Sequence, residues 1–265
     1  MNAAVEELNK RPLCTNTIRN LHCILLAGVR GRDKNPGEIR NRPNWIGPRG
    51  TPIERAIFVP PDPWGVKDAL FNWEQYLHSE EKDNIVQLAV LKAQFELIHP
   101  FSDGNGRIGR MLVPLILYSK NVLTSPTFYI SSYLERNRDL YYDRLITISQ
   151  EGNWNGWINF FLQAVVEQAD ENCQKAKDVI ELYNRMKQQL PEITHSQYTI
   201  QAIDTIFARP IFNSSEFAKR SEIPKQTAMR ILRELMDNDI LKLSRQGSGS
   251  RPNTYSFTDL IDIVR

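Results

Sequence analysis

The chain has 265 residues, 41% of them hydrophobic and 9% aromatic, and a formal net charge of +2 at pH 7. This apolar content excludes a disordered protein and suits one larger and one smaller domain, and the near-zero charge restricts nucleic-acid binding to a local basic patch. Three cysteines exclude a disulfide framework and, with no secretory signal and no long apolar run, predict a cytoplasmic protein with no membrane segment.

The first predicted element is a helix over residues 3–30, interrupted around Arg11–Pro12, with its apolar residues on one face. From residue 31 to 63 the chain is dense in Gly, Pro, Asn and Arg, and a long ordered loop of this kind is more often functional than not. Within this loop, Ile39-Arg40 and Trp45-Ile46-Gly47 predict a short β-hairpin. An ordinary surface hairpin over a buried Trp45 and a functional flap both stay open at this point.

Helical patterns then dominate as far as residue 190. In the segment that ends at Ile98, apolar residues recur at helical spacing and predict a buried helix. Residues 99–110 therefore lie between two core helices, which would hold that loop rigidly. The predicted helices cover Val66–His78, Ile85–Ile98, Asn105–Lys120, Arg138–Ser149 and Trp154–Leu190.

The run from His99 to Arg110 combines a base, a carboxylate, a turn framed by two glycines and two arginines. The glycines let successive backbone N–H groups converge on one anion, and the helix that begins near Asn105 turns its positive end to the same place. The two arginines lie three residues apart and can each hold phosphate oxygens. A neutral imidazole is available as a base at cellular pH, and one carboxylate with phosphate oxygens suits Mg²⁺.

Residues 99–110 read His-Pro-Phe-Ser-Asp-Gly-Asn-Gly-Arg-Ile-Gly-Arg, and they resemble the Fic family signature, H-x-F-x-(D/E)-G-N-G-R-x-x-R, at every defined position. The resemblance implies a transferase that moves AMP from ATP to a Ser, Thr or Tyr hydroxyl of a protein, itself included. It implies that His99 is the base, that Asp103 holds Mg²⁺, that Gly104, Asn105, Gly106 and Arg107 surround the phosphates, and that Arg110 holds the γ-phosphate.

The resemblance covers roughly residues 15–165 and implies two further sites. The segment at about 37–47 would be a flap that docks the target as an added strand through Ile39, Arg40, Trp45 and Ile46. On the helix that begins at Arg138, Tyr142 and Leu145 would border the adenine. Paired tyrosines in an amphipathic helix are, however, more often core residues than ligand contacts, so both interpretations stay open.

Residues 195–265 show a separate pattern of three helices followed by a hairpin of Leu241–Leu243 and Thr254–Phe257. This order resembles a winged helix-turn-helix, in which Lys225, Arg230, Arg245 and Arg251 are candidate DNA contacts. Basic and acidic residues nearly balance here, so protein docking or a packing extension are equally open.

The predicted fold is mainly α: a Fic-type helical domain with a β-hairpin flap over 1–190, then a small α+β winged helix-turn-helix over 195–265. The flap is placed at about 37–47, the signature at 99–110 and a linker helix at about 154–190. The predicted function is an ATP- and Mg²⁺-dependent protein adenylyltransferase. The alternatives are a transcriptional regulator with a non-catalytic Fic domain, or a Fic enzyme that uses another nucleotide.

The sequence says less about how activity is inhibited and about the oligomeric state. The inhibitory pattern of the family, (S/T)-x-x-x-E-(G/N), does not occur before the signature, and its match at Thr147–Gly152 falls at a helix end, where we interpret it as coincidence. A separate inhibitory partner and a homodimer both stay open.

Overall fold

The computed structural model describes residues 2–28, 34–48, 50–248 and 251–265. The chain forms two compact units, Met1–Asp170 and Glu171–Arg265, and the long helix α8 (Trp154–Thr194) runs from the first into the second. Within the described residues, no helix combines the length and apolar character needed to cross a bilayer. The last residues of the helix predicted over 3–30 lie outside the described part of the chain.

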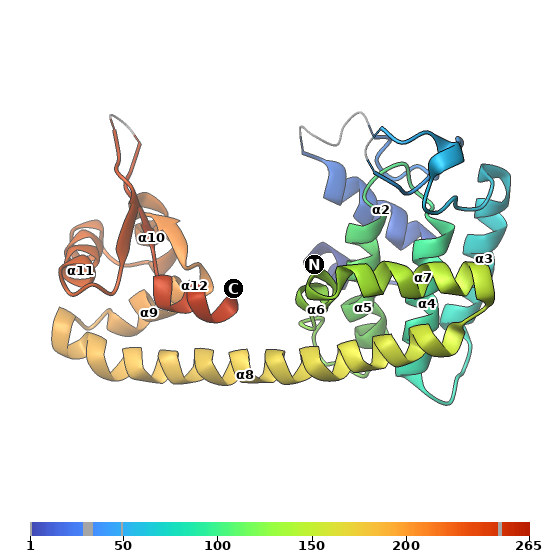
Figure 1. The fold of residues 1–265 in the computed structure, drawn as a ribbon. Helices are drawn as coiled ribbons and strands as arrows, with labels where there is room; N and C mark the ends of the chain where they lie inside the picture. The colour runs from blue at the N-terminus through green and yellow to red at the C-terminus, as the bar shows by residue number, and fades with distance from the viewer. Residues whose placement is uncertain (1, 29–33, 49, 249–250) are drawn as a thin grey trace. The chain divides into compact units, whose positions relative to one another are not determined.

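The first unit is helical, as predicted, and its two central helices carry the signature between them. Figure 1 shows α4 and α5 side by side, and each packs against the helices around them. The short helix α6 was not predicted. The elements are α1 Asn2–Leu8, α2 Thr15–Leu26, α3 Val66–His78, α4 Asn84–Ile98, α5 Asn105–Ser119, α6 Ser131–Arg136, α7 Arg138–Glu151 and the short 3-10 turns η1 Ile53–Arg55 and η2 Pro63–Gly65.

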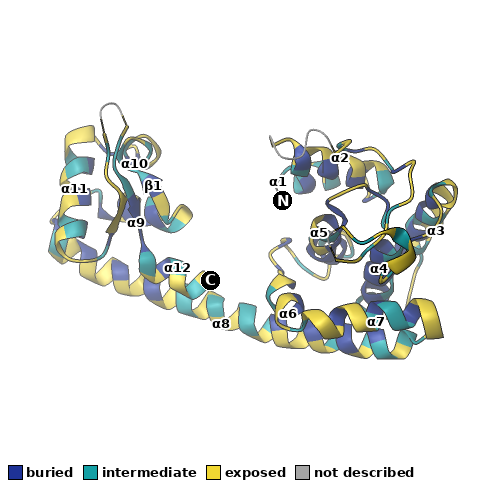
Figure 2. Ribbon diagram, turned by 45° about the horizontal axis from the view of Figure 1, so that its top comes forward, coloured by how far each residue is buried: buried dark blue, intermediate teal, exposed yellow. Residues whose placement is uncertain are grey.

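Helix α4 lies in the middle of the core and is fixed there by neighbours as well as by its own apolar residues (Figure 2). The buried indole of Trp73 donates a hydrogen bond to the carbonyl of Leu91 at 2.8 Å, and Trp157 donates one to the carbonyl of Ala89 at 2.8 Å. Both indoles therefore satisfy their polar group while burying a large apolar surface. The helix that ends at the signature is held from two sides.

The hairpin predicted within residues 39–47 does not form, and the prediction of a β-hairpin flap is corrected here. Ile46 instead pairs in an isolated antiparallel bridge with Phe58, well outside the expected span. Ile39-Arg40, the other expected strand, pairs with the signature instead: the N–H of Arg40 donates to the carbonyl of Pro100 at 2.9 Å. The segment therefore reaches the signature as irregular chain, with one bridge to the loop that follows.

The second unit holds the end of α8, four shorter helices and a three-stranded antiparallel sheet of order β1-β3-β2. The predicted hairpin is confirmed as β2 and β3, with Leu243 opposite Tyr255. Strand β1 and helix α12 were not predicted. The elements are α9 Thr199–Ala208, β1 Ile211–Asn213, α10 Ser214–Ser221, α11 Lys225–Asp237, β2 Lys242–Arg245, β3 Thr254–Ser256 and α12 Thr258–Val264.

Helix α8 continues past Pro191, where the sequence predicted its end, and stops at Thr194. The buried hydroxyl of Thr194 donates to the carbonyl of Leu190 at 2.9 Å, and His195 then takes a left-handed φ of 41°. Leu190 and Met186 are buried in the core of the second unit. Packing therefore holds the last turn together despite the hydrogen bond that proline removes. The boundary between the two units, after Asp170, lies inside α8.

Candidate functional site

His99 ends α4 in the left-handed conformation, with φ 49° and ψ 59°. Its Nδ1 lies 3.2 Å from the carbonyl oxygen of Glu96, and because a carbonyl can only accept, we place the proton on Nδ1. The lone pair is then on Nε2. Burial lowers the pKa of His99 below its usual value, although Glu96 partly opposes the shift. His99 is therefore a neutral imidazole whose Nε2 has no hydrogen-bond partner among the described residues and can accept a proton, as a general base must.

The side chain of Asn105 holds the signature loop closed and is buried, with 2% of its surface exposed. Its Oδ1 accepts from the N–H of Phe101 at 2.8 Å, and its Nδ2 donates to the carbonyl of the same residue at 2.7 Å. We expected Asn105 to contact phosphates. These bonds use one of the two N–H groups of Nδ2, so the other can still donate to a phosphate oxygen, and the expectation stays a prediction.

Helix α5 begins directly after this loop. Gly104 precedes the helix with a φ of +83°, which suits glycine. The N–H groups at the start of α5 have no partner inside the helix, and they carry its positive dipole end. Arg107 and Arg110 are both exposed beside this end. Nη1 of Arg110 lies so near the first turn that a Cβ on Gly106 would be 3.4 Å from it.

The carboxylate of Asp103 fits a magnesium ion that is shared with phosphate oxygens. Oδ1 accepts the N–H of Gly104 at 2.5 Å and lies 3.5 Å from Nη2 of Arg107, and about half of the side chain is exposed. In the described part of the chain Oδ2 has no bonding partner, so it can face a metal or solvent. No group of three or more His, Cys, Asp and Glu side chains that could hold a metal occurs within the described residues. A single carboxylate that relies on substrate oxygens is the usual protein site for Mg²⁺.

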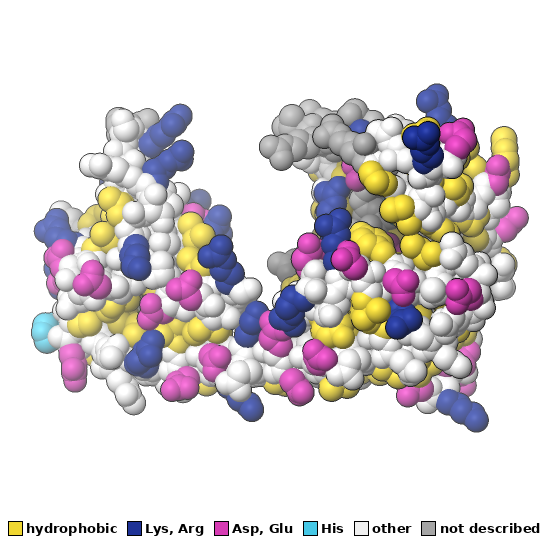
Figure 3. Space-filling model, viewed as in Figure 1, with side chains coloured by type: hydrophobic (Ala, Val, Ile, Leu, Met, Phe, Trp, Pro, Cys, Tyr) yellow, Lys and Arg dark blue, Asp and Glu magenta, His cyan; other side chains and the backbone are white. Residues whose placement is uncertain are grey.

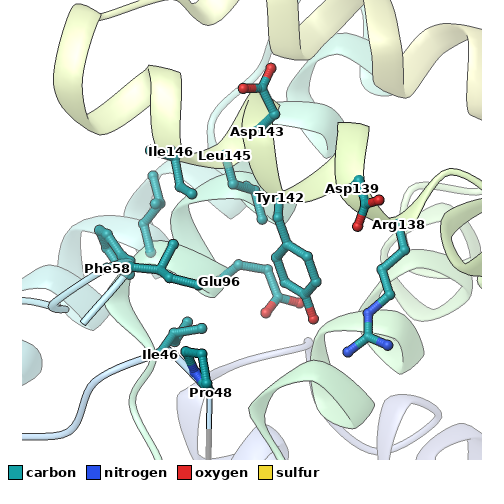
Figure 4. Close-up of a pocket in the computed structure, with 13 residues that line it drawn as sticks. Ile46, Pro48, Phe58, Glu96, Arg138, Asp139, Tyr142, Asp143, Leu145 and Ile146 are labelled. Atoms are coloured by element: carbon teal, nitrogen blue, oxygen red, sulfur yellow. The ribbon is translucent and has the colours of Figure 1, made fainter. Parts of the chain in front are cut away.

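A pocket of about 600 Å³ lies beside the end of α4, and it brings Tyr142, Leu145 and Ile46 together (Figure 4). Figure 4 shows Tyr142 on one side of the pocket, Ile46 and Phe58 on the opposite side and Glu96 between them. Tyr142 is 40% exposed, whereas Leu145 is buried. Two residues expected at the adenine and one expected in the flap thus share one apolar cavity of a size that suits a nucleobase.

The remaining flap residues have other neighbours. Ile39 is partly buried and packs against the main core. Trp45 is 43% exposed, and its Nε1 donates to the carbonyl of Thr51 at 2.7 Å. It is therefore not the buried residue beneath a hairpin that one interpretation of the sequence required, and its ring is available at the surface.

Arg40 was expected to dock a target, but its side chain is only 4% exposed and serves the signature instead. Its guanidinium donates to the carbonyl of His99 at 2.9 Å and to that of Pro61 at 2.5 Å, with a longer bond to Arg42 at 3.3 Å. This corrects the expectation for the Arg40 side chain. A planar guanidinium can satisfy several carbonyls at once, so Arg40 fixes the peptide that carries the base.

We expect Arg40→Lys to lower the free energy of unfolding by about 1.5–3 kcal/mol, because a single ammonium cannot replace the planar guanidinium and leaves partly buried carbonyls unpaired. Urea titration followed by tryptophan fluorescence measures this. Arg42→Lys is the matched control, because the side chain of Arg42 is exposed and should tolerate the same change. Equal stability of the two variants would contradict the role of Arg40.

A buried ion pair in the wall of the site was not predicted. Nζ of Lys92 lies 2.5 Å from Oε1 of Glu96 and donates to the hydroxyl of Tyr141 at 3.0 Å, and Lys92 is 1% exposed. Burial lowers the pKa of Lys92 and raises that of Tyr141. A Cβ on Gly109 would overlap the carboxylate of Glu96, so α5 can approach the pair only with glycine there. An i, i+4 Lys–Glu pair on an apolar helix was the signal available in the sequence.

In the second unit the four basic candidates differ. Arg230 donates to the carbonyl of Thr194 at 2.9 Å and to Glu234 at 2.6 Å, so its guanidinium is engaged within the protein. Arg230 is nevertheless exposed, as the other three candidates are, and basic side chains lie beside the β2–β3 hairpin (Figure 3). These three are Lys225 at the start of α11, Arg245 at the end of β2, and Arg251.

Known proteins resemble this chain in sequence and in fold. Residues 12–117 match the model of the Fic/DOC family. Over 69 residues the chain is 38% identical to a probable protein adenylyltransferase of Aquifex aeolicus (strain VF5), a match that covers 26% of this chain and 22% of that protein.

A solved structure of a Fic family protein from Desulfovibrio desulfuricans G20 has a similar fold. The TM-score is 0.57 at 18% identity, and the alignment covers 96% of this chain and 72% of the other. The likeness extends over both units and concerns the fold alone. The residues that match the family model, 12–117, include the whole signature and the segment that leads to it.

Proposed function

We propose that this chain is a protein adenylyltransferase that moves AMP from ATP to a hydroxyl group of a protein. The observation that carries the proposal is the state of His99: a neutral base with a free Nε2, fixed at the end of a core helix and followed within the same loop by an anion-binding helix start. The apolar pocket with Tyr142 and Leu145 supplies room for the adenine.

In this mechanism Nε2 of His99 accepts the proton of the attacking hydroxyl, and the hydroxyl oxygen forms a bond to the α-phosphorus. The bond between that phosphorus and the oxygen bridging to the β-phosphate breaks, and pyrophosphate leaves. The N–H groups of α5 and the exposed Arg107 and Arg110 bind the negative charge of the phosphates. Asp103 would hold Mg²⁺, which neutralises phosphate charge when it is bound.

The test compares two positions of the label. The purified chain is incubated with Mg²⁺, cell lysate and ATP labelled at either the α- or the γ-phosphate. Relative to lysate without the chain, we expect added protein-bound label from the α-phosphate only, on a target and on the chain itself. Added label from the γ-phosphate alone would mean a kinase. In a parallel incubation with α-labelled UTP, label where ATP gives none would mean another nucleotide. A specific DNA operator bound with no transfer at all would favour a transcriptional regulator.

The pH dependence of transfer should follow His99. Because burial lowers the pKa of this residue, the base loses its proton at a lower pH than a free histidine does. Initial rates at saturating ATP should therefore rise with pH, with a midpoint below about 6.5, and stay level between about pH 7 and 8. A midpoint above about 7 would contradict the neutral state of His99.

For the second unit we propose a winged helix that contacts DNA weakly. Its support is the order of α9, α10, α11 and the β2–β3 hairpin, with exposed Lys225, Arg245 and Arg251. Changing these three to Gln should abolish any DNA binding and leave AMP transfer to a free target unchanged. Fluorescence anisotropy at several salt concentrations measures the binding, and each lost phosphate contact should reduce the salt dependence. Binding that keeps its strength and salt dependence in the triple variant would exclude these contacts.

A further inference from the structure

His22 of α2 lies at the point where three segments meet, and its side chain is fully buried. Its ring stacks on the ring of Phe101 in the signature, with centroids 3.9 Å apart and planes 7° from parallel. Its two nitrogens contact two different loops: Nδ1 meets the backbone of Gly37, and Nε2 meets that of Asp103. No step of the proposed mechanism uses this histidine.

The two contacts determine the tautomer of the ring. The N–H of Gly37 donates to Nδ1 at 2.8 Å, so Nδ1 has no proton. Nε2 lies 2.9 Å from the carbonyl oxygen of Asp103, which can only accept, so Nε2 has the proton and donates it. Only the neutral ring protonated on Nε2 makes both bonds. His22 and His99 thus have opposite tautomers, as their different partners require.

The bond to Asp103 determines how the peptide between residues 103 and 104 is oriented. The carbonyl of this peptide accepts from His22, and its N–H donates to Oδ1 of Asp103 at 2.5 Å. The same peptide therefore holds one oxygen of the carboxylate and leaves Oδ2 for the metal. Gly104 lies against the imidazole so closely that a Cβ there would be 3.3 Å from Nε2.

The bond to Gly37 connects this loop to the segment that approaches the pocket. Gly37 has a φ of +76°, its N–H is held by His22, and its carbonyl accepts from Nε of Arg19 at 2.8 Å. Three residues later, Arg40 bonds to the signature as described above. Helix α2 therefore fixes the start of the segment through two side chains, one of which also holds the signature.

We propose that His22 is a positioning residue for the reaction: its neutral Nε2–H tautomer orients the 103–104 peptide and the Asp103 carboxylate and connects them to the segment at Gly37. The effect of His22 on catalysis rests on the proposed function. The effect of His22 on the loop is a property of the chain itself and is measured separately.

The first measurement uses the chain without nucleotide or metal. Nitrogen-15 NMR of the histidine side chains should show His22 as a neutral ring with its proton on Nε2 at neutral pH. In His22→Phe, which keeps the stacked ring and loses both hydrogen bonds, the amide signals of Gly37 and Gly104 should move most. A proton on Nδ1 in the native chain, or unmoved Gly37 and Gly104 signals in a folded variant, would overturn the proposal.

The second measurement follows AMP transfer at increasing Mg²⁺ concentrations. Removing partners that orient a metal ligand typically costs 10- to 100-fold in metal affinity or activity. We therefore expect His22→Phe to need roughly 10-fold more Mg²⁺ or to turn over roughly 10- to 100-fold more slowly, with an unchanged circular dichroism spectrum. His22→Gln, whose amide can donate to Asp103, should recover part of the loss. The control is His78→Phe at an exposed position of α3, which should behave as the native chain does.

The outcomes separate the two claims. If the native chain transfers no AMP, the proposed function fails, and the NMR measurement still decides whether His22 orients the loop. If the native chain is active and folded His22→Phe has the native rate and Mg²⁺ requirement, His22 does not position Asp103. Should His22→Phe unfold, His22→Gln decides: native kinetics together with unmoved Gly37 and Gly104 signals overturn the proposal, and a partial loss supports it.

Discussion

Replacing His99 by Ala should slow AMP transfer by about 10²- to 10⁴-fold and leave ATP affinity within about twofold of the native value. The imidazole accepts the proton of the incoming hydroxyl, whereas the nucleotide is bound by the N–H groups of α5, the arginines and the apolar pocket. The two properties therefore depend on different atoms. Transfer is measured from α-phosphate-labelled ATP, and affinity is measured by calorimetry with the same preparations.

A second substitution separates the loss of the base from a disturbed backbone. His99 is left-handed, a conformation that Asn adopts more readily than Ala does. His99→Asn should therefore keep the loop and still fail to transfer AMP. His78→Ala, an exposed histidine on α3, is the control for a substitution that should have no effect. Native rates in His99→Asn would mean that another group accepts the proton.

Replacing Lys92 by Met should lower the free energy of unfolding of the first unit by about 3–5 kcal/mol. The substitution leaves the carboxylate of Glu96 charged, largely buried and without its partner, which is the costly way to break a buried ion pair. The hydroxyl of Tyr141 loses its bond to Nζ at the same time. All five tryptophans lie before residue 170, so their fluorescence during urea titration reports on this unit alone.

The double variant Lys92→Met/Glu96→Leu is the informative comparison, because removing both charges avoids the unpaired carboxylate and should recover most of the lost stability. Arg11→Met breaks an exposed pair with Glu7 on the N-terminal side of the same unit and should change little. A Lys92→Met variant within about 1 kcal/mol of the native chain would contradict the buried pair. So would a double variant as unstable as the single one.

The signature and most helices were predictable because their signals are contiguous in the sequence. The residues from His99 to Arg110 are consecutive, and α4 and α5 show their apolar pattern on both sides of them. The β2–β3 hairpin was also found, because a turn rich in Gly and Ser separates two short β-prone segments. Local spacing contained the information in each of these cases.

The hairpin predicted near the site was wrong because its pairing depends on distant residues. Ile46 pairs with Phe58, and Arg40 is drawn to the signature, 59 residues away along the chain. The contact between His22 and Asp103 spans 81 residues. A single histidine or arginine in a sequence gives no sign of which distant carbonyl it will meet. The residues that position the site were therefore visible only once the chain was folded.

The chemical form of the adduct distinguishes AMP transfer from phosphate transfer. The native chain is incubated with ATP and Mg²⁺, either alone or with a target that the labelling experiment identifies. The proteins are then digested and analysed by tandem mass spectrometry. We expect one AMP group bonded through its phosphate to the oxygen of a Ser, Thr or Tyr side chain, and at least about 100-fold less of this adduct from His99→Ala in the same time. A bare phosphate at that oxygen, or an adduct that forms equally without His99, would contradict this expectation.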